Sequence, residues 1–170
     1  KSTLAARLCD RLSDYTRLVW HQQIDQTSLV NTLAKKLDRP QRQILLDSNE
    51  DLDYRLKNVF DVFGQLNQPL LLILDDFEWN LECPSASDDY ILKAGVAPLL
   101  QALVWAIQET NYYHRLIITS RYTFKSPLLE EFYHLESLPS FKYKESDLEK
   151  KLRRLEHFSS GKIDKNYIER

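Results

Sequence analysis

The chain has 170 residues, which is enough for one domain with a sizeable core. Its apolar fraction of 43%, charged fraction of 28% and net charge of -2 are typical of a globular protein and do not indicate a nucleic-acid or membrane-surface partner. No apolar run approaches the roughly 18 residues of a membrane span. The cysteines, two in number, are too few for a disulfide framework, so we expect a cytoplasmic protein with reduced thiols.

The first part of the chain has a helix pattern followed by a strand pattern and a second helix pattern. Apolar residues four apart predict a helix over 2–12, and an apolar run predicts a strand over 17–21. The next helix is predicted to be capped by Asp25 or Thr27, and Pro40 is expected to end this region.

The middle of the chain repeats this alternation. A helix is predicted over 51–63, with Gly64 in the position of a C-terminal helix glycine. The continuous apolar run 70–74 is typical of a strand that is covered on both faces. Pro98 can open another helix, and a second buried strand is predicted over 116–118.

The last part of the chain has weaker patterns. A third strand is predicted over 133–138, and Ser146 and Glu149 have the spacing of a capping box. Strands that alternate with helices indicate an α/β fold with a parallel sheet and helices on both faces. We expect one core over 1–155 and the start of a helical region over 156–170.

Lys1-Ser2-Thr3 opens the first predicted helix and matches the end of a phosphate-binding loop. In such a loop, a lysine neutralises the β- and γ-phosphates and the next hydroxyl binds Mg²⁺, so Lys1 and Ser2 would take these roles. These residues are a weak signal alone, because many surface helices begin with Ser or Thr.

The strand over 70–74 ends in Asp75-Asp76-Phe77-Glu78. Carboxylates in this position lie at the carboxyl edge of a sheet, where open α/β sheets bind their ligands. Asp75 would hold Mg²⁺, and either Asp76 or Glu78 would orient or deprotonate an attacking water. The alternative interpretation is a strand followed by an ordinary acidic turn.

The strand over 116–118 is followed by Thr119-Ser120-Arg121. Arg121 or Ser120 could reach a γ-phosphate from this strand end, whereas the alternative is a surface arginine. The chain has four histidines, none with metal-ligand spacing, so we interpret them as structural or surface residues.

Together and in this order, these segments resemble the signal-transduction P-loop NTPases, the STAND class that includes NACHT and NB-ARC-like domains. Residues 72–78 are similar to their Walker B segment, and 116–121 to their sensor segment. The resemblance implies a three-layer P-loop NTPase fold that is cut within the Walker A motif, so that the first strand is missing. A gap is then expected between the strands at 116–119 and 133–138.

The resemblance also implies a function, namely ATP or GTP binding and Mg²⁺-dependent hydrolysis in a regulatory switch. Lys1-Ser2-Thr3 would bind the nucleotide, and Ser2 and Asp75 the Mg²⁺. The expected partners are the nucleotide, further copies of the chain, and attached sensor or effector domains. A non-hydrolysing nucleotide-binding scaffold and a ring-forming AAA-type ATPase remain as alternatives, and the choice of base stays open between Asp76 and Glu78.

Overall fold

The structure is a computed structural model that describes residues 2–84, 90–126 and 134–137. The chain divides into two compact units, 1–133 and 134–170. In the second unit, the described residues 134–137 form neither helix nor strand. The prediction of a strand over 133–138 is wrong for these four positions, where the apolar side chain, Leu135, is 60% exposed rather than packed in a core, and positions 133 and 138 lie outside the described residues. The capping-box pair Ser146 and Glu149 lies outside the described residues.

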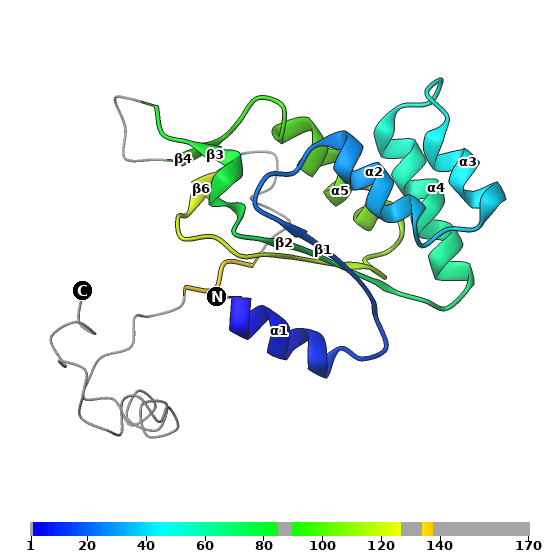
Figure 1. Ribbon diagram of the computed structural model, residues 1–170, viewed down its shortest axis with the longest axis horizontal. Coiled ribbons are helices and arrows are strands. Elements are labelled where there is room, and N and C mark those ends of the chain that lie inside the picture. Colours follow the sequence, from blue (N-terminus) through cyan, green and yellow to red (C-terminus); the bar gives the residue numbers. More distant parts are fainter. Residues whose placement is uncertain (1, 85–89, 127–133, 138–170) are drawn as a thin grey trace, which may run out of the picture. The chain divides into compact units, whose positions relative to one another are not determined.

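Three parallel strands form the main sheet of the first unit (Figure 1). They are β1 (Thr16–His21), β2 (Leu70–Asp75) and β5 (Arg115–Ile118), and β2 lies in the centre. Leu72 is in register with a leucine on each neighbouring strand, Leu18 on β1 and Leu116 on β5. The strands that the sequence predicted in these three places are therefore confirmed, and so is their parallel pairing, but the strand at 116–118 is half-buried rather than buried.

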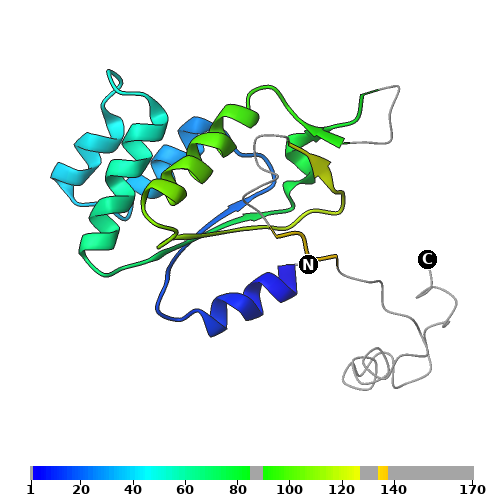
Figure 2. The same cartoon turned by 180° about the vertical axis from the view of Figure 1, so that it is seen from behind.

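Helices cover both faces of this sheet (Figure 2). One face packs against α2 (Gln26–Ala34), α4 (Leu52–Gln65) and α5 (Ala97–Glu109) through a core that includes Leu18, Trp20, Leu70, Leu72 and Leu74. On the other face, Leu71 and Ile73 contact Cys9 of α1 (Ser2–Arg11). Because every residue of β2 is buried, its sequence is apolar at every position before Asp75 rather than alternating.

One helix, α3 (Arg39–Leu46), is absent from the sequence prediction. Pro40 does not end the preceding region but lies in the first turn of α3, where its missing N–H group costs no hydrogen bond. Asp38 caps the helix by accepting a hydrogen bond from the Gln41 N–H over 3.0 Å. Pro40 therefore marks the start of a helix rather than the end of one.

The end of α4 also differs from the prediction. Gly64 lies within the helix, and Asn67 adopts the left-handed conformation with φ of 55°. The Asn67 N–H bonds to the Gly64 carbonyl over 3.0 Å, and the Gln68 N–H to the Phe63 carbonyl over 2.9 Å. This pair of bonds is the Schellman motif, with Asn67 in the left-handed position that was predicted for Gly64.

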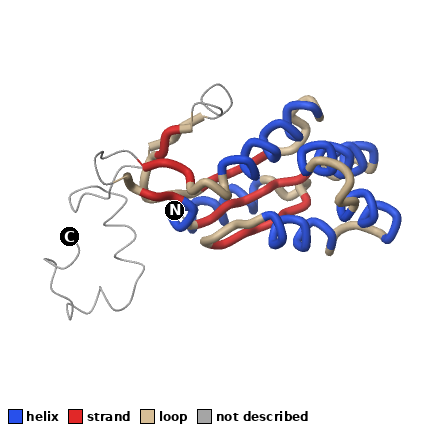
Figure 3. Tube along the Cα trace, turned by 90° about the horizontal axis from the view of Figure 1, so that it is seen from above, coloured by secondary structure: helices blue, strands red, loops and turns tan. Residues whose placement is uncertain are grey.

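A second, smaller sheet follows the carboxyl end of β2 (Figure 3). A short 3₁₀ helix, η1 (Phe77–Asn80), leads into β3 (Leu81–Glu82), which pairs with β4 (Tyr90–Leu92). On its other side, β4 pairs with β6 (Phe124–Lys125), so the order is β3-β4-β6. This sheet connects the segment after β2 with the segment after β5, and its strands are too short for sequence periodicity to reveal.

Candidate functional site at the carboxyl edge of the sheet

Asp75 is the last residue of β2, and it is only 5% exposed. Its Oδ1 accepts a hydrogen bond from Thr119 Oγ1 over 2.5 Å, and its Oδ2 lies 3.4 Å from His21 Nδ1. His21 ends β1, and Thr119 directly follows β5. Both oxygens of the carboxylate are thus held by side chains from the two neighbouring strands.

The turn after Asp75 is fastened to the neighbouring strand end by Thr119. Asp76 adopts the left-handed conformation, with φ of 54° and ψ of 45°, and its N–H donates to Thr119 Oγ1 over 3.2 Å. The Phe77 N–H donates to the Thr119 carbonyl over 2.8 Å, and the Thr119 N–H to the Leu74 carbonyl over 2.9 Å. Left-handed residues other than glycine are uncommon and cluster at functional sites.

Glu78 and Arg121 form an ion pair across the same edge. Glu78 Oε1 lies 3.0 Å from Arg121 Nε, and Glu78 Oε2 accepts the Arg121 backbone N–H over 3.3 Å. The Glu78 side chain is 13% exposed, and that of Arg121 is 70% exposed. Glu78 comes from η1 and Arg121 from the segment after β5, so this pair also joins the two strand ends.

Asn80 is a buried amide that connects η1 with the loop after β1. Its Oδ1 accepts the Ile24 N–H over 2.9 Å, and its Nδ2 donates to the carbonyls of Gln22, over 2.7 Å, and Phe77, over 3.3 Å. The side chain is fully buried and has its polar atoms satisfied. It fixes η1, and therefore Glu78, relative to β1.

The start of α1 lies at this same edge of the sheet, because α1 runs back along the sheet before residues 12–15 lead into β1 (Figure 1). Ser2 and Thr3 form the first turn of α1, and Lys1 lies outside the described residues. The structure thus brings the ends of β2 and β5, with Asp75, Asp76, Glu78 and Arg121, to the edge where α1 begins.

Sequence reasoning missed three residues of this edge. The sequence predicts a structural or surface role for His21, no role for Thr119 separate from its two neighbours, and none for Asn80. A signal existed for His21, because it ends one apolar strand as Asp75 ends another, and the two are partners in the strand register. No sequence signal marks Asn80, whose bonds depend on the path of the loop.

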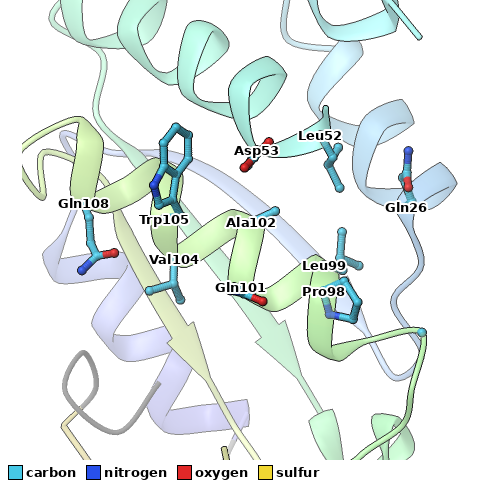
Figure 4. A pocket seen from close by; sticks show the side chains of 11 residues that line it. Gln26, Leu52, Asp53, Pro98, Leu99, Gln101, Ala102, Val104, Trp105 and Gln108 are labelled. Carbon is cyan, nitrogen blue, oxygen red and sulfur yellow. The ribbon is translucent and has the colours of Figure 1, made fainter. Parts of the chain in front are cut away.

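A cavity of about 460 Å³ lies elsewhere, between α5, the first turn of α4 and the start of α2 (Figure 4). Its lining combines apolar side chains, such as Leu52, Leu99 and Trp105, with the amide groups of Gln26 and Gln101. None of the residues at the carboxyl edge lines it. The chemistry-bearing side chains and this cavity are therefore separate features of the fold.

No group of three or more His, Cys, Asp or Glu side chains in the described part of the chain is arranged to hold a metal ion. Asp75 offers hard carboxylate oxygens, the ligand type that Mg²⁺ prefers. Mg²⁺ usually keeps several waters and binds through one or two carboxylates together with substrate phosphates. The donor set at this edge fits that mode of binding rather than an all-protein cage.

Comparison with known proteins gives no match to a family model, to a curated protein or to a solved structure. Within the described ranges, no helix has the length and apolar character needed to cross a membrane.

Proposed function

We propose that this chain is the core of a P-loop nucleoside triphosphatase of the signal-transduction type, which binds ATP or GTP and hydrolyses it with Mg²⁺ as part of a regulatory switch. The observation that carries the proposal is the position of Asp75. It is a buried carboxylate at the carboxyl end of the central parallel strand, and side chains from both neighbouring strands hold it. Ligands of open α/β sheets bind at this edge.

Three further features support the proposal. The described sheet is parallel with helices on both faces, which is the layering of the resembling class. The start of α1 lies at the same edge, where a helix N-terminus favours phosphate oxygens. Arg121 is an exposed cation at this edge, and it would face charge that develops on a transferred phosphate.

Each residue then has a part in the proposed reaction. Asp75 would hold the Mg²⁺ together with the Ser2 hydroxyl, while Lys1 would bind phosphate oxygens and Thr3 would lie in the first turn of α1 beside them. Bound Mg²⁺ supplies charge that neutralises the phosphates. Asp76 would orient the attacking water, since its half-buried carboxylate makes no hydrogen bond or ion pair with the other described residues.

The proposal requires a glycine-rich phosphate-binding loop directly before Lys1. Its backbone N–H groups would surround the phosphates, and Lys1 and Ser2 alone could not replace them. A Gly-x-x-x-x-Gly segment in the gene immediately before Lys1 is therefore the simplest sequence test of the assignment. Attached sensor domains and self-association belong to the same proposal, because a switch needs an input and an output.

The direct test is Asp75→Asn in the intact protein. The substitution keeps the shape of the side chain and an acceptor for Thr119, but it removes the charge that balances the metal. We expect Mg²⁺-dependent turnover to fall by at least about 100-fold. Asp14→Asn is the matched control, because Asp14 is exposed and lies at the opposite end of β1.

Turnover by Asp75→Asn at the parental rate would remove Asp75 from the metal site and overturn the assignment. A parental protein that binds Mg²⁺-nucleotide tightly and yet never hydrolyses it would instead identify the non-hydrolysing scaffold. Unfolding curves of both variants check that a loss of turnover is not a loss of fold.

A further inference from the structure

Both oxygens of the Glu78 carboxylate contact Arg121. Oε1 contacts the guanidinium at Nε over 3.0 Å, and Oε2 accepts the backbone N–H of the same residue over 3.3 Å. The carboxylate therefore fixes both the backbone and the side-chain direction of Arg121. Because Glu78 is only 13% exposed, few other positions are open to its side chain.

The Arg121 guanidinium contacts Glu78 on one side, and much of the rest of the side chain is exposed to solvent. Its side chain is 70% exposed, and its guanidinium makes no hydrogen bond or ion pair with any described residue other than Glu78. Contact at Nε orients the planar group, so the side of the guanidinium away from Glu78 faces solvent. An oriented guanidinium offers two parallel N–H donors to phosphate oxygens, which an ammonium group cannot do.

We propose that Glu78 is a positioning residue that orients Arg121 toward the terminal phosphate of the bound nucleotide, and that it is not the base of the reaction. This inference rests on the proposed nucleotide function. It predicts that Glu78 determines how well the site distinguishes a triphosphate from a diphosphate, since only the triphosphate reaches Arg121.

The same contacts distinguish Glu78 from Asp76 as candidates for the general base. A general base must come within hydrogen-bond distance of the water from which it takes a proton. The oxygens of Glu78 are already bonded to Arg121, whereas the Asp76 carboxylate has no hydrogen-bond or ion-pair partner among the described residues. Of the two acids that the sequence left open, Asp76 is thus the one available to water.

The test compares ATP and ADP affinity in the intact protein, with GTP and GDP used if the parent prefers guanine. Arg121→Ala should reduce the preference for the triphosphate by about 100-fold, and Glu78→Gln by about tenfold. The double variant should resemble Arg121→Ala alone, because Glu78 acts through Arg121. Glu82→Gln is the matched control, as Glu82 is an exposed carboxylate on β3.

A second variant tests orientation without touching Glu78. Arg121→Lys keeps the charge but loses the Nε donor and the planar group, so it should lose most of the triphosphate preference. Because Arg121 is exposed, this variant should keep the parental melting temperature. Full preference in Arg121→Lys would show that charge alone suffices and would overturn the inference.

The other outcomes are equally decisive. Glu78→Gln with parental preference but no turnover would make Glu78 the base, and losses that simply add in the double variant would make the two residues independent. Either result overturns the inference and leaves the proposed function in place. A parental protein that binds neither nucleotide overturns the proposed function itself.

Discussion

The hydroxyl of Thr119 donates a hydrogen bond to Asp75 Oδ1 over 2.5 Å and so joins the end of β5 to the end of β2. The same oxygen accepts the Asp76 N–H over 3.2 Å. One side chain therefore fixes the carboxylate proposed to hold the metal and the left-handed turn that follows it. Removing the hydroxyl should disturb both.

We predict that Thr119→Val lowers the free energy of unfolding by about 1–3 kcal/mol, because it keeps the shape but leaves two polar groups without their partner. It should also raise the Mg²⁺ concentration for half-maximal turnover by about tenfold. Thr119→Ser, which retains the hydroxyl, is the control. Urea unfolding and a Mg²⁺ titration measure the two effects, and a Val variant equal to the parent in both would show that the hydroxyl does not hold Asp75.

The strands that position this site were predictable because each contains a short apolar run, although only β2 is buried at every position. The run Leu70–Leu74 is apolar at every position, as a strand covered on both faces must be, and Asp75 ends it. The parallel pairing followed from the helices between the strands. These features depend on local sequence and on the layering of the fold alone.

The parts that sequence reasoning missed depend on three-dimensional arrangement. His21 faces Asp75 only because β1 and β2 pair in one particular register. The bonds of Asn80 require the loop after β1 to pass beside η1. Glu78 could be recognised as an acid at a strand end, but its pairing with Arg121 needs both strand ends to be in place.

The predicted helix boundaries were wrong for a different reason, since one residue type can either start or end a helix. Pro40 can stop a helix or occupy its first turn, and the choice depends on the Asp38 cap. Gly64 and Asn67 are both residues that can take the left-handed position, and the chain uses Asn67.

The position of Gly64 inside α4 gives a second prediction. A Cβ added at Gly64 would lie 3.9 Å from the ring of Tyr113, an ordinary contact, and alanine has the higher helix propensity. Gly64→Ala should therefore stabilise the protein by about 0.5–1 kcal/mol. Asn67→Ala should destabilise it, because alanine is strained at φ of 55°.

Chemical unfolding of the two variants measures these changes in the free energy of unfolding, which should have opposite signs. Asn67 also accepts a hydrogen bond from the Tyr113 hydroxyl over 2.8 Å, so Asn67→Gly serves as a control that removes this bond without backbone strain. Destabilisation by Gly64→Ala would contradict the structure and restore Gly64 as the left-handed cap.

His114 is fully buried beside the start of β5 and joins α4 to β2. Its Nδ1 accepts the Leu70 N–H over 3.0 Å, and its Nε2 lies 3.0 Å from the Phe60 carbonyl. Because a backbone N–H can only donate and a carbonyl can only accept, the imidazole must be neutral, with its proton on Nε2. A second proton would have to face the Leu70 N–H.

Burial lowers the pKa of His114 below its ordinary value of 6.5, and the hydrogen bond to Phe60 and the charge of Asp61 offset this only in part. As the pH falls, the unfolded chain therefore binds a proton at His114 before the folded chain does. The stability that His114 contributes is fully present above about pH 6.5 and is lost as the pH falls from there toward the folded pKa.

We thus predict that the free energy of unfolding of the intact protein decreases as the pH is lowered beyond about 6.5. His114 should contribute up to about 1.4 kcal/mol per pH unit to this decrease, which urea titration at a series of pH values measures.

His114→Phe should be less stable at neutral pH, because Leu70 and Phe60 lose their hydrogen-bond partner, but its plot of unfolding free energy against pH should be flatter between about pH 5 and 6.5. His134→Gln is the control for the removal of a histidine, since the His134 side chain is 88% exposed. The slope, rather than the absolute stability, decides the matter, and a His114→Phe curve parallel to that of the parent would assign the acid sensitivity to other groups.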